Sequence, residues 1–173
     1  MRHTSDRDLV ATSPGNAGSH RRDRMRTLSD ALVSGTLAGI ASAAIGTLAA
    51  RAQGQAPAAL LNAVSHVLWG ERAARQDAAS ARYTATGFVI NHAASIFWAA
   101  CYEALRRRAP RGPAGALASA AATAALAYVV DYHLVPRRLT PGYELRLKGP
   151  QMAVIYAAIA LSLPLRELLR RQR

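Results

Sequence analysis

Four polar side chains lie inside or at the end of apolar stretches of this sequence, where they are well placed to do chemistry. Asn91 and His92 follow an apolar run, and Asp131 and His133 close a later one. An imidazole titrates near neutral pH, and a neighbouring carboxylate raises its pKa. His92 and Asp131 therefore predict a proton- or cation-exchanging pair, with His133 or His66 nearby.

The same residues also fit a purely structural role. Asn91, His92 and Asp131 would then be hydrogen-bonding groups between helices, with Asp131 compensated by Arg137 or Arg138. Asp131 and His133 are two residues apart, so they do not share a helix face. The sequence contains no HExxH, paired-carboxylate or glycine-rich phosphate motif, and only one cysteine. We therefore expect no enzymatic activity, no cofactor and no metal site.

Long uncharged stretches must position these side chains. They cover residues 31–50, 83–102, 112–130 and 149–165. A helix of about 20 residues spans the roughly 30 Å of a bilayer, and the fourth stretch is near the short limit. The sequence therefore predicts an all-α integral membrane four-helix bundle over residues 29–173. Its expected spans are about 31–50, 84–105, 114–135 and 150–168. A soluble alanine-rich helical bundle is the alternative, because the mean hydropathy is only +0.03.

The segments outside the spans carry two further predictions. Residues 1–28 are arginine-rich and lack apolar periodicity, which indicates a disordered basic cytoplasmic tail. A twin-arginine export signal at Arg21 and Arg22 is the alternative for this segment. Between the first two spans, leucine and valine side chains recur at helical spacing and end at Trp69, which favours an interfacial helix over about 57–69 on the outer leaflet.

The charge balance is strongly basic, with 22 Lys and Arg against 10 Asp and Glu and a net charge of +12. Such a charge is typical of nucleic-acid binders. Here the arginines cluster between the spans, and 14 of the 22 basic residues lie inside if both termini are cytoplasmic. We therefore expect cytoplasmic termini, anionic lipid headgroups as partners of Arg106, Arg107 and Arg108, and no nucleic-acid partner.

The first span also carries a packing signal. Gly35, Gly39 and Ala43 recur at every fourth position, and Gly46 follows. Small residues at this spacing let another helix approach closely. Packing within the bundle is the favoured interpretation, and homodimerisation through this face is the alternative.

Three segments carry a family resemblance: Asn91–Trp98, Pro136–Gly142 and Leu165–Arg171. They resemble small four-span bacterial inner-membrane proteins and, more distantly, the YagU-like (DUF1440) family. The resemblance implies an inner-membrane, multi-pass protein and carries His92 and the Leu139–Pro141 turn over as shared features. The leading expectation is thus a structural or envelope-stress role. The second is a small proton- or cation-linked transporter or channel, and the third is an accessory subunit of a larger complex.

Overall fold

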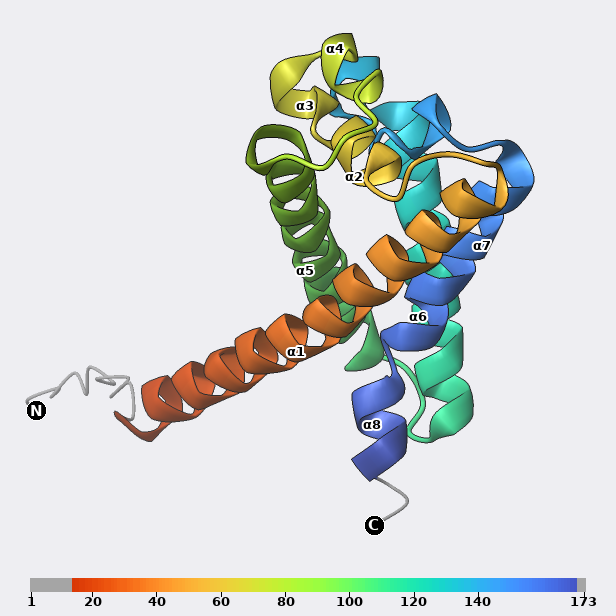
Figure 1. Cartoon of the computed structure of the whole chain (residues 1–173). Coiled ribbons are helices and arrows are strands. Elements are labelled where there is room, and N and C mark those ends of the chain that lie inside the picture. The colour runs from red at the N-terminus through yellow and green to blue at the C-terminus, as the bar shows by residue number, and fades with distance from the viewer. Residues whose placement is uncertain (1–13, 171–173) are drawn as a thin grey trace, which may run out of the picture.

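The computed structural model describes residues 14–170, including the side chains of 21, 22 and 24–170, and over this range the chain is helical without strands. This confirms the all-α prediction. Four long helices form the body (Figure 1), namely α1 Pro14–Ala52, α5 Thr86–Arg106, α6 Pro113–Val129 and α7 Gly149–Ser162. The shorter elements are α2 Ala59–Val64, α3 His66–Trp69, α4 Glu71–Ala74, α8 Leu165–Arg170, π-helical turns at Ala81–Ala85 and Val130–Leu134, and 3₁₀ turns at Arg137–Leu139 and Tyr143–Leu145.

The body has two distinct ends (Figure 1). One, which we call the loop end, holds the connections at residues 53–85 and 135–148. The other, the terminal end, holds the N-terminal half of α1, the turn at residues 107–112 and α8. The two chain-terminal helices therefore leave the bundle at the same end.

Helix α1 begins far earlier than the sequence indicated. It is helical from Pro14, so residues 14–28 are not the disordered tail that we expected, and residues 1–13 lie outside the described part. Proline is favoured in the first turn of a helix, and alanine and arginine extend a helix well. Because the apolar part of α1 already nucleates the helix, adding preceding residues costs little. This end of α1 projects away from the other helices in Figure 1.

Local signals account for the ends of the other long helices. Ser80 accepts a hydrogen bond from the Tyr83 backbone N–H at 3.1 Å, which caps the π-helical turn that leads into α5. Gly112 has a φ of 122°, and Pro113 then opens α6 at the first helical position. Pro164 lacks a backbone N–H, and the expected span 150–168 is accordingly divided into α7 and α8.

The bundle hides small and polar side chains and exposes large apolar ones. The buried polar residues of its four long helices are Ser34, Ser42, Asn91, Ser95, Ser119, Thr123 and Ser162. Large exposed side chains line the outer faces of the same helices: Leu32, Ile40 and Leu48 on α1, Val89 and Phe97 on α5, Leu117 and Leu126 on α6, and Val154 and Leu161 on α7. A water-soluble protein rarely exposes so continuous an apolar surface, whereas hydrocarbon solvates it well.

Three helical segments among the described residues are long and apolar enough to cross a membrane by length and composition. They are Arg24–Ala52, Pro113–Leu134 and Gly149–Arg170. Helix α5, which covers the expected span 84–105, is not one of them. The reason is its content of Asn91, His92 and Glu103, which lower its mean hydropathy. The structure thus supports three of the four expected spans on this criterion.

Residues 57–69 do not form the single amphipathic interfacial helix that we expected. The segment breaks at Ser65 into α2 and α3, and its polar side of Asn62 and Ser65 is fully buried while Leu68 is exposed. The Asn62 amide donates to the carbonyls of Gln76 and Ala78 at 2.9 and 3.0 Å. These carbonyls lie in the following loop and need donors, which explains why the polar side faces inward.

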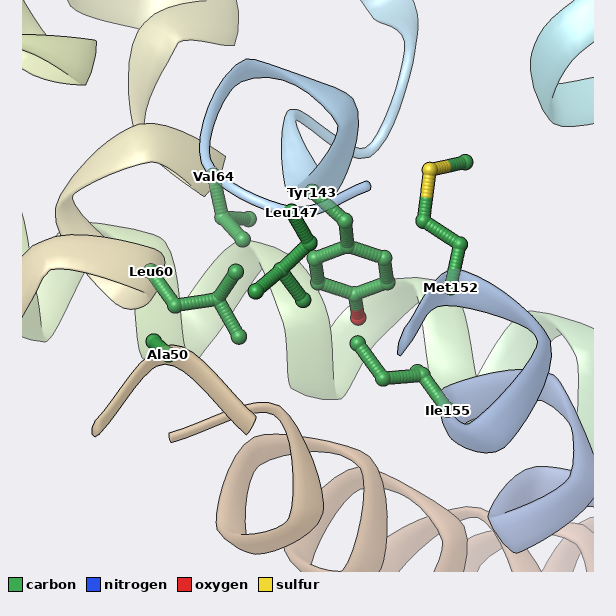
Figure 2. Close-up of a cluster of buried hydrophobic side chains, with 7 residues drawn as sticks. All are labelled: Ala50, Leu60, Val64, Tyr143, Leu147, Met152 and Ile155. Carbon is green, nitrogen blue, oxygen red and sulfur yellow. The ribbon is translucent and has the colours of Figure 1, made fainter. Parts of the chain in front are cut away.

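An apolar cluster holds the loop end together (Figure 2). It joins the end of α1, helix α2, the 3₁₀ turn Tyr143–Leu145 and the start of α7, through Ala50, Leu60, Val64, Tyr143, Leu147, Met152 and Ile155. The segment 135–148 is thereby fixed over the ends of α1 and α7, which positions Tyr143 above the middle of the bundle.

Candidate functional site

Asn91 is the centre of a buried hydrogen-bond network between α1, α5 and the loop end. Its side chain is 3% exposed, and its amide donates to the Gly39 carbonyl at 2.9 Å. Its Oδ1 accepts hydrogen bonds from the Ser42 hydroxyl at 3.3 Å and from the Tyr143 phenol. Burial raises the pKa of Tyr143 well above its usual range, so this phenol stays protonated and donates. The network joins three segments that are distant in sequence.

His92 faces α1 rather than α6. Its Nε2 lies 3.3 Å from the Thr36 hydroxyl, and its ring stacks on Phe88 with centroids 5.8 Å apart. Its Nδ1 is buried without a hydrogen-bond partner, beside Gly39. A side chain at position 39 would occupy the space that the imidazole needs.

Asp131 faces α7 from the π-helical turn Val130–Leu134. Its Oδ2 accepts a hydrogen bond from the Tyr156 phenol at 2.6 Å. The ion pairs among the described residues do not include Asp131, so neither Arg137 nor Arg138 compensates it as the structural interpretation expected. Arg138 instead donates to the carbonyls of Val67 and Leu68 at 3.0 and 3.1 Å. The Asp131 carboxylate thus has the Tyr156 phenol and the Trp98 indole as its neutral partners and forms no ion pair among the described residues.

A cavity of about 90 Å³ lies between α5, α6, α7 and the loop end. Asn91 and Asp131 both line it, together with three aromatic side chains, Trp98, Tyr143 and Tyr156. Its other polar lining residues are Ser95 and Thr140, and the rest of the wall is aliphatic. One carboxylate beside aromatic faces and aliphatic walls is a surrounding that suits a small cation. We call this space the Asp131 cavity.

The structure brings together only part of the predicted site. Asn91 and Asp131 share the Asp131 cavity, but His92 is absent from its lining and engages Thr36 instead. His133 is exposed, and its ring lies against Tyr128 with centroids 5.8 Å apart. His66 is buried against the carbonyls of Ala63 and Arg137. The expected exchange pair of His92 and Asp131 is therefore not formed.

The aromatic members of the cavity were not anticipated from the sequence. Trp98 lies seven residues after Asn91, which is two helical turns and places the two on one face of α5. Tyr156 gave no comparable signal, because an apolar helix with a single tyrosine does not show which face meets α6. Tyr143 lies in a connection without periodicity, and only the fold places it over Asn91.

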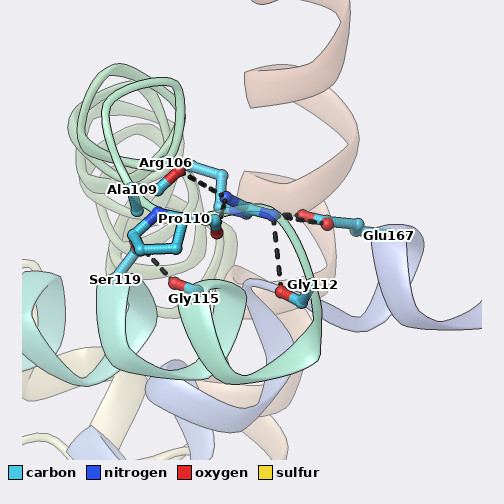
Figure 3. A network of polar contacts seen from close by, with 7 residues as sticks. All are labelled: Arg106, Ala109, Pro110, Gly112, Gly115, Ser119 and Glu167. Atoms are coloured by element: carbon cyan, nitrogen blue, oxygen red, sulfur yellow. Dashed lines mark hydrogen bonds and ion pairs between the residues drawn. The ribbon is translucent and has the colours of Figure 1, made fainter.

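The terminal end is held by a second polar network (Figure 3). Arg106 donates to both carboxylate oxygens of Glu167 on α8, at 2.8 and 2.7 Å, and to the carbonyls of Pro110, Ala109 and Gly112. Arg107 donates to Thr27 on α1, and Arg108 is exposed. The guanidinium of Arg106 is thus occupied within the protein, and the contact of Arg106, Arg107 and Arg108 with anionic headgroups stays a prediction.

The small-residue face of α1 is covered within the chain. Gly35 lies against the backbone of Ile96, Gly39 against His92 and Ser95, and Gly46 against Leu60 and Ile155. These contacts use the positions that homodimerisation would require.

Comparisons of the chain with protein families, with curated proteins and with solved structures find no match. Within the part of the chain that the structure describes, no group of three or more His, Cys, Asp or Glu side chains is arranged to hold a metal ion.

Proposed function

We propose that this chain is a non-enzymatic, four-pass protein of the bacterial inner membrane with both termini in the cytoplasm. The apolar outer surface includes α5 as well as the three helices that are long and apolar enough, which supports a fourth pass. The two chain-terminal helices leave the bundle at one end, where ten arginines of the described residues gather: Arg21, Arg22, Arg24, Arg26, Arg106, Arg107, Arg108, Arg111, Arg166 and Arg170. By the positive-inside rule, this end is cytoplasmic.

The proposed activity is the binding of a small cation in the Asp131 cavity, as part of transport or sensing. The carrying observation is that Asp131 lies in the apolar segment Pro113–Leu134, beside a cavity with aromatic walls, without an ion pair among the described residues. An ionised carboxylate at such depth is costly and is generally kept for a partner. The cavity volume of about 90 Å³ is several times the ~10–15 Å³ that one water molecule needs.

A small alkylammonium ion matches this cavity better than a bare metal ion. Its charge pairs with the carboxylate, and its methyl groups contact the faces of Trp98, Tyr143 and Tyr156. His92 has no part in this site, so the transport hypothesis changes from an imidazole–carboxylate pair to a carboxylate in an aromatic cavity.

A structural role is the second candidate, and the Asn91 network supports it. Asn91 bonds to Gly39 of α1 and to Tyr143 of the loop end, and Asp131 separately bonds to Tyr156 of α7. These hydrogen bonds stabilise the bundle without any ligand. The membership of a YagU-like family and a role in envelope stress stay proposals of this kind, carried by the residue patterns at 91–98, 136–142 and 165–171.

Replacing Asp131 with asparagine is expected to weaken cation binding at least tenfold. Asparagine keeps the shape and accepts the Tyr156 hydrogen bond, but it removes the charge that attracts the cation. Isothermal titration calorimetry of the purified full chain in detergent, with tetramethylammonium chloride against sodium chloride at equal ionic strength, measures the change. The matched control is Asp77→Asn, because Asp77 is exposed and pairs with Arg146 away from the cavity.

Two results would count against the cation site. Equal affinities of the wild type and Asp131→Asn would remove Asp131 from it, and an absence of tetramethylammonium binding to the wild type would leave the structural role. The topology is measured separately with reporter fusions after Arg173 and within residues 75–80. We expect a cytoplasmic C-terminus and an external loop, and the reverse signals would overturn the orientation.

A further inference from the structure

A second cavity, of about 250 Å³, opens at the terminal end between α1, α5 and α8. It is separate from the Asp131 cavity and shares no lining residue with it. Its wall is mostly charged or polar and consists of Asp30, Ser34, Tyr102, Glu103, Leu163, Arg166, Glu167 and Arg170. We call it the Glu103 cavity.

Most charges of the Glu103 cavity neutralise one another. Asp30 pairs with Arg166, and Glu167 pairs with Arg106 at 2.7 Å. Glu103 forms no ion pair among the described residues: its Oε1 accepts a hydrogen bond from the Ser34 hydroxyl at 3.1 Å. Arg106 and Arg107 attract it only from a distance, because their guanidinium groups bond to Glu167 and Thr27.

Arg170 supplies the opposite charge in the same cavity. Its side chain is exposed, and the described residues offer it no ion pair or hydrogen bond. The cavity therefore presents one carboxylate and one guanidinium that are not paired with each other or with a neighbour. A ligand with a cationic group and an anionic group would complement both.

Tyr102 provides independent evidence for a ligand. This side chain lines the cavity and is only 2% exposed, and its hydroxyl is buried. The Arg106 guanidinium is a hydrogen-bond neighbour that only donates, so no described residue accepts the hydrogen of this hydroxyl. A buried donor without an acceptor is destabilising, so such groups are rare and generally meet a ligand or water. The Tyr102 hydroxyl is a donor for an anionic oxygen in the cavity.

We infer that the Glu103 cavity binds the headgroup of an aminophospholipid, with the primary ammonium on Glu103 and the phosphate between Arg170 and Tyr102. The inference rests on the proposed membrane insertion, because the cavity lies where the apolar segments Arg24–Ala52 and Gly149–Arg170 give way to charged side chains. That position is the depth of the lipid phosphates. The carboxylate distinguishes this ligand from phosphatidylglycerol, whose headgroup lacks an ammonium.

Native mass spectrometry of the purified full chain in detergent tests the assignment. The protein is titrated with phosphatidylethanolamine, phosphatidylcholine and phosphatidylglycerol of identical acyl chains. We expect phosphatidylethanolamine to bind at least tenfold tighter than the other two, because its ammonium donates hydrogen bonds to Glu103 and the trimethylated choline group does not. Glu103→Gln keeps an acceptor for Ser34 and should reduce the affinity for phosphatidylethanolamine to that for phosphatidylcholine.

Two further variants make the result specific. Glu71→Gln changes an exposed carboxylate at the loop end and should leave all three affinities unchanged. Tyr102→Phe should weaken phosphatidylethanolamine and phosphatidylcholine by similar factors, since both carry the phosphate, and keep their ratio. Unchanged melting temperatures show that the variants are folded.

Three outcomes would overturn the inference. The first is that Glu103→Gln keeps the full preference for phosphatidylethanolamine, and the second is that the wild type binds the three lipids equally. Displacement of the lipid by free O-phosphoethanolamine at comparable concentration would assign the cavity to a soluble zwitterion. Flotation with vesicles tests membrane insertion separately, so a failure of the membrane proposal can be distinguished from a failure of the lipid site. Asp131→Asn should not change lipid binding, because Asp131 does not line the Glu103 cavity.

Discussion

Asn91→Leu is expected to lower the free energy of unfolding by about 2–4 kcal/mol. Each hydrogen bond between helices of a membrane protein contributes ~0.6–1.7 kcal/mol. A buried polar group that loses its partner costs a further ~1–3 kcal/mol. Leucine has a similar volume but neither donates nor accepts. It removes the hydrogen bonds of Asn91 with Gly39, Ser42 and Tyr143 together. The Tyr143 hydroxyl, buried in the apolar cluster at the loop end, then loses its amide acceptor and keeps only the Ser42 hydroxyl as a polar neighbour.

Unfolding of the purified chain in detergent, followed by circular dichroism during titration with sodium dodecyl sulfate, measures this loss. The control is Gln53→Leu, because among the described residues the Gln53 side chain donates only to the Ala49 carbonyl of the adjoining helix α1, at 3.4 Å. The double variant Asn91→Leu/Tyr143→Phe should recover part of the stability, as it removes the hydroxyl that has lost its amide acceptor. A loss for Asn91→Leu no greater than that for Gln53→Leu would show that the network does not hold the bundle.

The positions of the long helices could be predicted because charged residues flank the apolar part of each helix. The spans expected at 84–105 and 114–135 match α5 and α6 with the π-helical turn Val130–Leu134. The same criterion misplaced the start of α1, since a basic segment without apolar periodicity is as compatible with a projecting helix as with a disordered tail. Charged residues therefore mark where the apolar part of a helix ends, but they do not mark the end of the helix itself.

The candidate site could be predicted only in part, because depth along a helix is readable from sequence and rotation about its axis is not. With the expected spans 84–105 and 114–135, the rise per residue places His92 about 12 Å and Asp131 about 6 Å from the same end of the bundle. Their directions depend on packing: Gly39 makes room for His92 on α1, and Tyr156 receives Asp131 on α7. Asn91, next to His92, faces about 100° away around the helix and therefore reaches the cavity instead.

In the segment 57–69, the apolar pattern did not predict which side chains are buried. An apolar stripe predicts which side chains avoid water, but in this segment the polar side is buried as well, since Asn62 meets two loop carbonyls. Partners of this kind come from residues 76–84, whose conformation has no periodic signal. Buried polar side chains in connections are thus found from the fold and not from the pattern.

Gly35→Val is expected to produce the second large loss, at or above the upper end of the ~1–3 kcal/mol that overpacking costs. A Cβ at Gly35 would lie 2.5 Å from the Cα and 2.9 Å from the backbone N of Ile96. Backbone atoms in the middle of α5 cannot move alone, so α1 and α5 would have to separate. That separation would also lengthen the contacts of Asn91 with Gly39 and of Ser34 with Glu103.

The matched control is Gly149→Val, which has open space around its Cβ position and an ordinary φ. It introduces the same side chain at the start of α7 without a close neighbour, so the difference between the two variants mainly reports the close approach of the helices. Gly46→Ala should cost less than Gly35→Ala, because its nearest neighbour is the end of the flexible Leu60 side chain, which can change rotamer. Thermal unfolding in detergent measures all four variants, and equal melting temperatures for Gly35→Val and Gly149→Val would mean that α1 and α5 are not packed through this face.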